Sequence, residues 1–537
     1  MIVNNNIGYL CTRRQCELGL GENISFRWLS SKNHIKDFSF SDLDKLSNRF
    51  ANALLSLEIQ PGEVVFTFLP KCPEQFFVFL GTLKNKCIIG TLFTSFGNEA
   101  LLDRLGDSKA TAVITTKAHY HKLKSIIPNL PHLKFIIIID SDTDLSDNVL
   151  SYSKLILDAS EEYQVRYTPP ETPSVLHYTS GSTGKPKGVL HCHRSILHQS
   201  YTTANILGLE EEDIYWCTAD QGWVTGTSYG IIGPWSLGVT QIHYGGAYNP
   251  EEWMKLLETQ KVNVWYTAPT ALRMLMREDD TLYTQRNLSQ LRSIFSVGEP
   301  LNPEILTWSR KVFKKDVYDT WFQTETGGIM ISNCPKLEIK PGSMGKPVEG
   351  IEVGILNDKH EQLPVNQKGN LCLKPGWTSM FTTYLNNEEA YKSKFKNNWY
   401  HTGDMAYRDK DEYIWFLGRS DDVINTSGHL ISPFEIESCL LEIPEILESG
   451  VIGVPDPLLY EKVVAFVHLK EGIRLDTHME LKLKVHLSKN LSTTAIPQEI
   501  IAIDSVPKNK SGKIMRRYLK ATYLGQEAGD ISTLDIN

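Results

Sequence analysis

The sequence lacks long apolar runs and paired cysteines. Phe135 to Ile139 is an apolar run that suits a buried strand, but it is far shorter than the ~18 to 20 residues of a membrane helix. The 9 cysteines are scattered without a CxxC pair, and Met1 leads into polar Asn4 to Asn6 rather than an apolar signal region. We therefore expect a reduced, cytoplasmic protein with buried free thiols and no membrane partner.

An excess of positive charge is also missing. The formal net charge of -8 argues against broad binding of nucleic acid, so a site for an anion must be built locally. Hydrophobic residues (41%) and charged residues (22%) lie near the usual values for a globular enzyme. A chain of 537 residues exceeds the roughly 250 to 300 residues that one core supports, so several packed subdomains are expected.

Helical and strand patterns alternate along the chain. From Phe38, apolar residues at helical spacing follow a Ser41 cap and end at a Pro-Gly pair before a Val-rich strand. The same reading predicts a helix over Pro73–Lys84 and strands over Ala112–Thr115, Phe135–Ile139 and Val262–Tyr266. Such alternation predicts an α/β fold of layered sheets.

A smaller αβ segment follows Arg419. It contains a predicted helix over Pro433–Leu441 and a predicted strand over Val463–His468. We therefore predict a large N-terminal domain over residues 1–419 and a small C-terminal domain over residues 420–537.

The stretch YTSGSTGKPKG, from Tyr178 to Gly188, is the most informative segment. It lies between a strand-like SVLHYT and a helix-like HRSILHQ, and its glycines, hydroxyls and lysines suit a loop that wraps a polyphosphate. Gly/Ser/Thr runs are also common in solvated loops, so composition alone leaves both interpretations open. The GxxxxGK[ST] spacing of a P-loop is absent, because Thr179 replaces its first Gly and Pro186 its hydroxyl, which disfavours a Walker-type NTPase.

This loop resembles the phosphate signature of the acyl-adenylate-forming superfamily, which includes acyl-CoA synthetases, luciferases and peptide-synthetase adenylation domains. Four further motifs follow in that family's order: DTWFQTETGG from Asp319, YHTGD ending at Asp404, GRSDDVINTSGH from Gly418 and PKNKSGK ending at Lys513. The similarity runs from about Phe38 to Arg517. It implies a large domain that binds ATP and an acid, and a small C-terminal domain that rotates between two half-reactions.

The resemblance assigns the nucleotide site residue by residue. Glu325 corresponds to the family's Mg²⁺ carboxylate, Thr324 to its phosphate-contacting hydroxyl, and Asp404 to the carboxylate that accepts both ribose hydroxyls. Arg419 would contact the ribose or the α-phosphate. The remaining ATP-binding positions that it implies are Thr179, Ser180, Gly181, Ser182, Thr183, Gly184, Lys185, Gly298, Glu299, Pro300, Asp319, Thr320, Trp321 and Gln323.

Lys513 resembles the catalytic lysine that bridges the acyl carboxylate and the α-phosphate. An exposed Lys in a basic terminal run is otherwise only a solvated charge, so the PKNKSGK context carries this assignment. Acetylation of Lys513 would remove the charge and stop adenylation, which makes a lysine acetyltransferase and a deacetylase candidate partners.

The CoA half of the reaction is assigned by resemblance to three positions. Asp421 matches the hinge at which the C-terminal segment swings. Gly428 matches the position past which pantetheine travels, where any Cβ would crowd the thiol arm. Lys489 is a weaker candidate for the CoA 3′-phosphate. Most of the long N-terminal extension of many acetyl-CoA synthetases is missing, which leaves the CoA nucleotide contacts open.

The acid pocket resembles that of acetyl-CoA synthetases. Its matching positions are Trp223, Val224, Thr225, Val297 and Phe322. Acetate-specific members usually carry Trp where this chain has Phe322, so extra room is expected and propionate becomes a second candidate, since one methylene is discriminated by only about 1 to 3 kcal/mol. Leu430 also departs from the pattern, because it replaces an Arg that approaches the phosphates.

The resemblance thus implies an AMP-forming acetate–CoA ligase that uses ATP, Mg²⁺ and CoA. Three alternatives stay open: a ligase for another short acid, an acyl-AMP ligase that loads a carrier protein, and a non-catalytic nucleotide-binding protein. The presence of Gly428 and the WVTG pocket favours CoA over a carrier. Lys185, Glu325, Asp404 and Lys513 together argue against a non-catalytic role.

Overall fold

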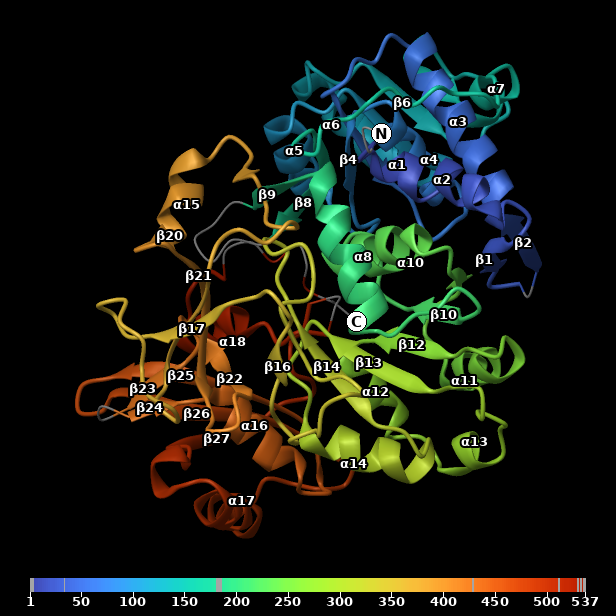
Figure 1. Cartoon of the computed structure of the whole chain (residues 1–537). Helices are drawn as coiled ribbons and strands as arrows, with labels where there is room; N and C mark the ends of the chain where they lie inside the picture. Colours follow the sequence, from blue (N-terminus) through green and yellow to red (C-terminus); the bar gives the residue numbers. More distant parts are fainter. Residues whose placement is uncertain are drawn as a thin grey trace.

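The structure is a computed structural model of the whole chain (Figure 1). It describes residues 4–32, 34–179, 186–426, 429–509 and 512–528, together with residues 531 and 534. In this part of the chain the strands form four sheets, which confirms the predicted layered α/β architecture. No helix within these ranges combines the length and the apolar character needed to cross a bilayer.

The first sheet is built largely from repeated strand–helix units. Its strands β8, β4, β3, β5, β6 and β7 are neighbours in that order, and β7 is at the edge. Pairs β3–β4, β3–β5 and β5–β6 are parallel, as short helical crossovers require. In spatial order its strands are β19 (Thr383–Tyr384), β9 (Lys187–Cys192), β8 (Pro173–Thr179), β4 (Ile88–Thr91), β3 (Val64–Phe68), β5 (Ala112–Thr115), β6 (Phe135–Ile138) and β7 (Val149–Ser151). Its helices include α3 (Phe40–Ser56), α4 (Glu74–Lys84), α5 (Asn98–Asp107) and α6 (Lys117–Ile126).

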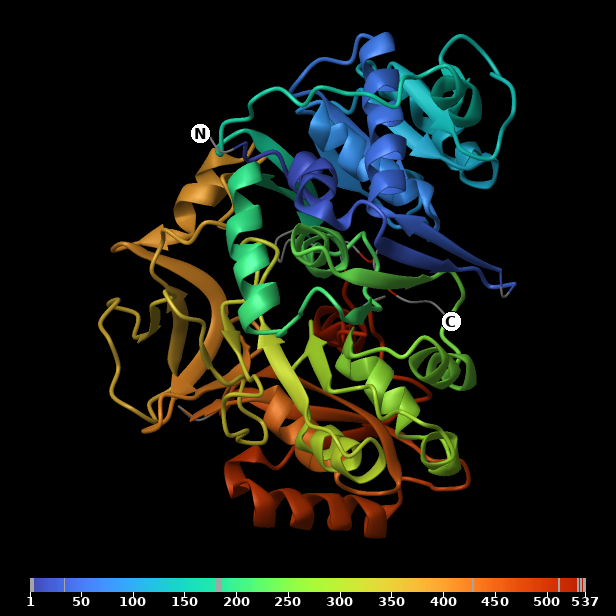
Figure 2. The same ribbon diagram turned by 45° about the vertical axis from the view of Figure 1, so that its right-hand side comes forward.

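The second sheet is larger and has a run of parallel strands at its centre. The pairs β10–β12, β12–β13 and β13–β14 are parallel, so the carboxyl ends of these strands meet at one edge. Its order is β16 (Lys346–Pro347), β15 (Ile331–Ser332), β14 (Val317–Trp321), β13 (Ser293–Val297), β12 (Val264–Thr267), β10 (Ile214–Cys217), β11 (Thr240–Tyr244), β1 (Ile24–Leu29) and β2 (Ile35–Ser39). Helices α11 (Pro250–Thr259), α12 (Pro269–Leu275) and α14 (Pro303–Val312) connect its strands, and α8 (Ile196–Asn205) lies between the two large sheets (Figure 2).

Two smaller sheets complete the molecule. One contains β17 (Val353–Leu356), β18 (Gly369–Leu373), β21 (Trp399–Arg408), β20 (Phe395–Lys396) and β22 (Ile414–Arg419), with α15 (Glu388–Ser393) before β20. The other contains β24 (His429–Ile431), β23 (Ile424–Thr426), β26 (Tyr460–Leu469), β25 (Ile446–Asp456) and β27 (Glu499–Ala502). Helices α16 (Pro433–Leu441) and α17 (Thr477–Asn490) cover one face of this last sheet, and α18 (Arg516–Leu524) covers the other.

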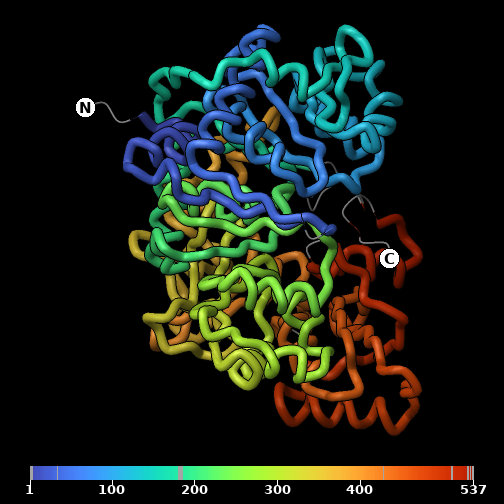
Figure 3. Tube along the Cα trace, turned by 90° about the vertical axis from the view of Figure 1, so that its right-hand side faces the viewer, coloured from blue at the N-terminus to red at the C-terminus, as the bar shows by residue number. Residues whose placement is uncertain are grey.

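The last sheet has its own buried core on each face. Val451 packs with α16 and α17, whereas its neighbour Ile452 packs with Leu519 of α18. This alternation follows from the two-residue period of a strand. The C-terminal segment therefore forms a separate lobe, which lies along one side of the body as the orange and red trace (Figure 3).

Several local predictions are confirmed and two need correction. The helix over Pro433–Leu441 and the strand over Ala112–Thr115 have the predicted bounds, while the strand predicted at Val262 begins at Val264. Ser41 is not the cap of the first long helix. Ser39 is, because its hydroxyl accepts from the Asp42 amide while the Asp42 carboxylate accepts from the Ser39 amide.

The second correction concerns the glycine-rich loop. Sequence patterns placed it between a strand and a helix, but the strand β9 begins at Lys187 and pairs antiparallel with β8. The loop therefore joins two strands of a hairpin, and α8 begins only at Ile196. Ser180, Gly181, Ser182, Thr183, Gly184 and Lys185 lie outside the described residues.

Candidate functional site

A cleft of about 1660 Å³ lies between the body and the C-terminal lobe. All five sequence motifs contribute to its walls. The described part of the glycine-rich segment supplies Thr179 and Lys187. The predicted site residues that line it are Thr179, Trp223, Val224, Thr225, Val297, Gly298, Glu299, Pro300, Asp319, Thr320, Trp321, Phe322, Gln323, Thr324, Glu325, Asp404, Arg419 and Lys513. Segments far apart in sequence thus meet in one space.

The floor of the cleft is formed by the carboxyl ends of β13 and β14. Val297 pairs with Thr320, so the residues after these two positions enter the cleft side by side. Gly298 follows β13 with a φ of +91°, a conformation that residues with a Cβ rarely adopt. Ligand sites in parallel sheets commonly form at this edge, which explains why SVGEP and DTWFQTETGG lie together.

One end of the cleft is aromatic. Phe322 follows β14, and its ring meets the Tyr229 ring edge-on with centroids 5.4 Å apart. Trp223 precedes the short helix α9 (Val224–Thr227), and its ring lies 4.9 Å from that of Phe93. These rings hold the apolar walls in fixed positions, so this end suits a small apolar group.

The carboxylate of Glu325 is oriented by a tyrosine. The hydroxyl of Tyr384, which lies in β19, donates to Glu325 Oε1 at 2.8 Å, and burial raises the pKa of this tyrosine, so the phenol keeps its proton. The neighbouring backbone is held by His191, whose Nε2 lies 2.8 Å from the Thr324 carbonyl oxygen. Burial lowers the pKa of His191, so the ring is neutral and donates from Nε2.

Asp404 is buried in the cleft, with 4% of its surface exposed. Its Oδ2 accepts from Trp321 Nε1 at 3.2 Å and from Gln323 Nε2 at 3.0 Å, and Arg419 Nε lies 3.6 Å from Oδ1. Burial raises the pKa of Asp404, which Arg419 and Lys513 partly oppose. The pairing of β21 with β22 sets Asp404 directly opposite Arg419.

Lys513 reaches the cleft from the C-terminal lobe. Its backbone amide donates to Asn509 Oδ1 at 2.9 Å, and its carbonyl accepts from the Asn509 amide at 2.8 Å, so two hydrogen bonds hold Lys513 to Asn509. Burial in the cleft and repulsion from Arg419 lower the pKa of the Lys513 ammonium, while Asp422 and Asp404 attract it. The ammonium therefore faces the same space as Glu325 and Asp404.

Gly512 fixes how this loop meets the body. Its φ is +89°, and an added Cβ would lie only 2.2 Å from Thr270 Oγ1 at the start of α12. The Thr270 hydroxyl instead donates to the Gly512 carbonyl at 3.3 Å. A residue without a side chain is therefore required at this contact.

Further polar contacts join the lobe to the body. Arg277 donates to the Leu447 carbonyl at 3.0 Å, and Asn302 Nδ2 donates to Ser438 Oγ at 2.7 Å. Among the other predicted positions, Asp421 is exposed with its carboxylate 3.7 Å from Arg419, and Lys489 is exposed at the end of α17 and does not line the cleft. Gly428 lies outside the described residues.

Sequence reasoning did not identify Tyr384 or His191. Tyr384 lies within the stretch FTTYLNN, and His191 lies in the strand β9, so neither belongs to a recognisable motif. Only the approach of β19 to β9 brings Tyr384 beside Glu325. No local signal in the sequence reports this long-range pairing.

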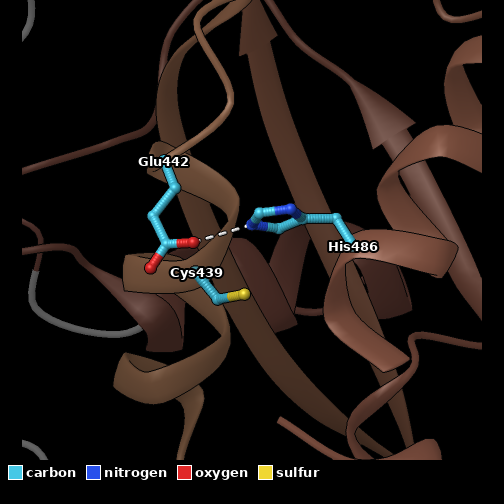
Figure 4. A group of neighbouring side chains, drawn as sticks. All are labelled: Cys439, Glu442 and His486. Atoms are coloured by element: carbon cyan, nitrogen blue, oxygen red, sulfur yellow. Dashed lines mark hydrogen bonds and ion pairs between the residues drawn. The ribbon is translucent and has the colours of Figure 1, made fainter. Parts of the chain in front are cut away.

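A second group of reactive side chains lies away from the cleft, between α16 and α17 (Figure 4). His486 Nε2 lies 2.8 Å from the Glu442 carboxylate, and Cys439 is nearby. Burial, with smaller contributions from Glu442 and Glu304, raises the pKa of the Cys439 thiol to about 11. A hydrogen bond between His486 and Glu442 beside a protonated, packed thiol accounts for this group. All nine cysteines are free thiols, and seven are buried.

Comparison with known proteins covers nearly the whole chain. The AMP-binding enzyme family matches residues 22–385, and the AMP-binding enzyme C-terminal domain matches residues 435–513. Acetyl-coenzyme A synthetase of Bacillus subtilis is 43% identical over 532 residues, which is 99% of this chain and 92% of that protein. The protein of the same description from Salmonella typhimurium is 37% identical, covering 93% of this chain and 81% of that protein.

Solved structures agree with this relationship. The crystal structure of the anthranilate CoA ligase AuaEII in complex with anthranoyl-AMP matches with a TM-score of 0.88 at 28% identity, over 97% of this chain and 98% of that chain. The benzoate CoA ligase of Burkholderia xenovorans shares the fold, with a TM-score of 0.85 at 24% identity. These matches confirm the predicted fold, a large N-terminal α/β domain with several sheets and a small C-terminal domain. The chain therefore belongs to the AMP-binding enzyme family.

Proposed function

We propose that the chain is an AMP-forming acetate–CoA ligase, which converts acetate, ATP and CoA to acetyl-CoA, AMP and diphosphate. The observation that carries this proposal is the single cleft that the aromatic side chains Trp223 and Phe322, the carboxylates of Glu325 and Asp404, and Lys513 line together. In the first step a carboxylate oxygen of acetate attacks the α-phosphorus and diphosphate leaves. In the second step the CoA sulfur attacks the acyl carbon and AMP leaves.

The charged end of the cleft would hold the nucleotide. Asp404 has two oxygens that suit the two ribose hydroxyls, and the backbone of Gly298, Glu299 and Pro300 offers an edge for the adenine. Thr324 is held near the phosphates by His191. A carboxylate oriented by a phenol is a hard oxygen donor of the kind that Mg²⁺ prefers, so Glu325 would hold the ion, which would offset phosphate charge when bound.

Lys513 would stabilise the charge that develops between the acid and the α-phosphate. Its position opposite Asp404 and Glu325 suits the adenylation step, so the lobe orientation seen here corresponds to the first half-reaction. Acetylation of Lys513 by a lysine acetyltransferase would remove the charge and stop this step, and a deacetylase would restore it. The buried free thiols support placement in a reducing compartment, the cytoplasm.

The aromatic end would select the acid. The Phe322 ring packs edge-on against Tyr229 and lines the cleft together with Trp223 and Val224, so the acid would lie beside these side chains. Acetate fits this space, and propionate is the nearest competitor because one methylene changes binding by only about 1 to 3 kcal/mol.

For the second step, the C-terminal lobe from residue 420 would turn about Asp421 and bring Gly428 to the cleft. Asp421 is exposed and lies two residues after the end of β22, in the segment that joins the body to the lobe. Lys489, exposed on the lobe, would meet the CoA 3′-phosphate.

An AMP-release assay with acids of increasing length tests the function. We expect CoA-dependent AMP release with acetate and propionate, and a steep decline from butyrate onward. Carrier protein in place of CoA is the control for an acyl-AMP ligase. AMP release that requires carrier protein, or none with any acid, would contradict the proposal.

The CoA step is tested separately with Gly428→Leu. A leucine side chain would crowd the thiol arm but leave the nucleotide site alone, so acetate-dependent pyrophosphate exchange should persist while thioester formation falls at least about 100-fold. Exchange and thioester formation measured on one preparation give the comparison. Normal thioester formation in this variant would exclude the assigned path.

A further inference from the structure

Lys394 is a cation of the cleft that no sequence motif includes. It follows α15 and precedes the hairpin of β20 and β21, where its carbonyl accepts from the His401 amide at 2.7 Å. Its side chain lines the cleft, whereas Lys392 pairs with Glu388 at 2.8 Å and Lys396 is exposed away from the cleft wall. One lysine of three in this short segment therefore faces the site.

The Lys394 ammonium lies at the back of Gly403, beside Arg419. Its Nζ is 3.8 Å from the point that a Cβ on Gly403 would occupy, and Arg419 Nη2 is 3.5 Å from the same point. Two cations thus converge on one spot next to Asp404, the residue after Gly403. Gly403 has a φ of +81°, a conformation that favours glycine, so no side chain of residue 403 occupies this spot.

The charges around Lys394 belong to the nucleotide end of the cleft. Glu325 and Asp404 attract the ammonium, while Arg419 and Lys187 repel it, and burial lowers its pKa. Within the described ranges no carboxylate lies inside the 4.0 Å ion-pair distance of its Nζ. A largely desolvated cation without a paired anion is costly unless a ligand supplies the charge.

We propose that Lys394 binds the nucleotide phosphate next to the ribose, together with Arg419. This inference rests on the proposed nucleotide placement, in which Asp404 holds the ribose and Glu325 the metal. The spot shared by Lys394 and Arg419 lies at Gly403, next to Asp404, and Glu325 also attracts the Lys394 ammonium, so a phosphate attached to a ribose on Asp404 would come within reach of both cations. Glu325 and Asp404 would repel an anionic ligand, and a second cation here would offset that repulsion.

The test compares AMP with adenosine, which differ only in the phosphate. Isothermal titration calorimetry is performed on full-length wild type, Lys394→Met, Lys394→Arg and the matched control Lys396→Met. We expect Lys394→Met to weaken AMP binding about 10- to 100-fold and to leave adenosine binding unchanged. Lys394→Arg should restore most of the AMP affinity, and Lys396→Met should resemble wild type.

Two results would overturn the inference. Equal weakening of AMP and adenosine in Lys394→Met would mean that the lysine only supports the fold, and unchanged AMP binding would mean that it contacts no phosphate. Thermal melting of each variant shows whether it folds normally. If Lys394→Met has a folding defect, the AMP and adenosine affinities of Lys394→Arg, compared with wild type, decide whether the charge at this position binds the phosphate. Acetate-dependent AMP release by wild type tests the proposed function independently, so the two ideas fail by different results.

Discussion

The body wall of the cleft is held by strand pairing, whereas the wall that carries Lys513 rests on separate polar contacts. Asp404 is fixed by its pairing opposite Arg419 and by donors from Trp321 and Gln323. The loop of Lys513 touches the body through the hydroxyl of Thr270, at 3.3 Å from the Gly512 carbonyl. Each hydrogen bond of this kind is worth only about 0.5 to 1.5 kcal/mol net, so the lobe can leave without unfolding either core.

This difference assigns separate tasks to the two walls. A wall built into a sheet can fix the nucleotide and the acid in both half-reactions. A lobe with its own core on both sheet faces can exchange one surface for another as a rigid unit. Changes in the lobe should therefore separate the two half-reactions, whereas changes in the body should alter substrate choice or stability.

The largest expected effect is that of Lys513→Ala. Removing a charge that acts in the transition state should lower acetate-dependent pyrophosphate exchange by about 10² to 10³. Thioester formation from supplied acetyl-AMP should stay near the wild-type rate, because the adenylation surface is then not needed. Both rates are measured on the same preparation.

Lys470→Ala is the matched control for this experiment. Lys470 is exposed on the lobe and lies outside the cleft, so both half-reactions should remain at wild-type rates. If Lys513→Ala lowers the two half-reactions equally, the division of tasks between the walls is wrong.

The parts of the site that the sequence revealed are those carried by contiguous motifs. Residues 319–325 form the end of β14 and the segment directly after it, so a single stretch of sequence predicts the floor of the cleft. Gly298 has a positive φ, a conformation that the presence of glycine suggests. Helix α16 has the predicted bounds because Ser432 caps it, Pro433 occupies its first turn and apolar residues repeat at helical spacing.

The parts that the sequence did not reveal depend on long-range pairing. Tyr384, His191 and Lys394 reach the site only because β19 joins β9 and because α15 leads into the β20–β21 hairpin. The cap of α3 was misplaced for a local reason. Ser39 and Ser41 are both of a residue type that caps helices, and only the reciprocal hydrogen bonds between Ser39 and Asp42 identify Ser39 as the cap. The hairpin after the glycine-rich loop was missed because KGVLHC passes directly into a helical pattern.

A middle-sized effect is expected at Phe322 in the body wall. Phe322→Trp fills space beside Tyr229, so the ratio of propionate to acetate turnover should fall roughly tenfold. Phe322→Ala opens the same space and should shift the preference toward longer acids. Values of kcat/KM for acetate, propionate and butyrate measure both changes. An unchanged order of acids in both variants would mean that this ring does not bound the acyl pocket.

The smallest expected effect concerns stability and Asp319. Burial raises the pKa of this carboxyl to about 7, although the Ser296 hydroxyl and nearby backbone amides lower it. Because the folded pKa lies above the unfolded one, this carboxyl favours folding most at low pH. This contribution to the free energy of unfolding falls by at most about 1.4 kcal/mol per pH unit as the pH rises from about 4 to 7. Above pH 7 it no longer changes.

Asp319→Asn removes this titration while keeping nearly the same shape. The stability of the variant relative to wild type should therefore increase from pH 5 to pH 7 and level off at higher pH, as urea or thermal unfolding can measure. Asp316→Asn serves as the control, because Asp316 lies three positions before Asp319 and is a partly exposed carboxylate paired with Arg310. A stability difference for Asp319→Asn that is constant across this range would show that Asp319 is ionised throughout, and the rigid floor of the cleft would then carry a charge that its burial argues against.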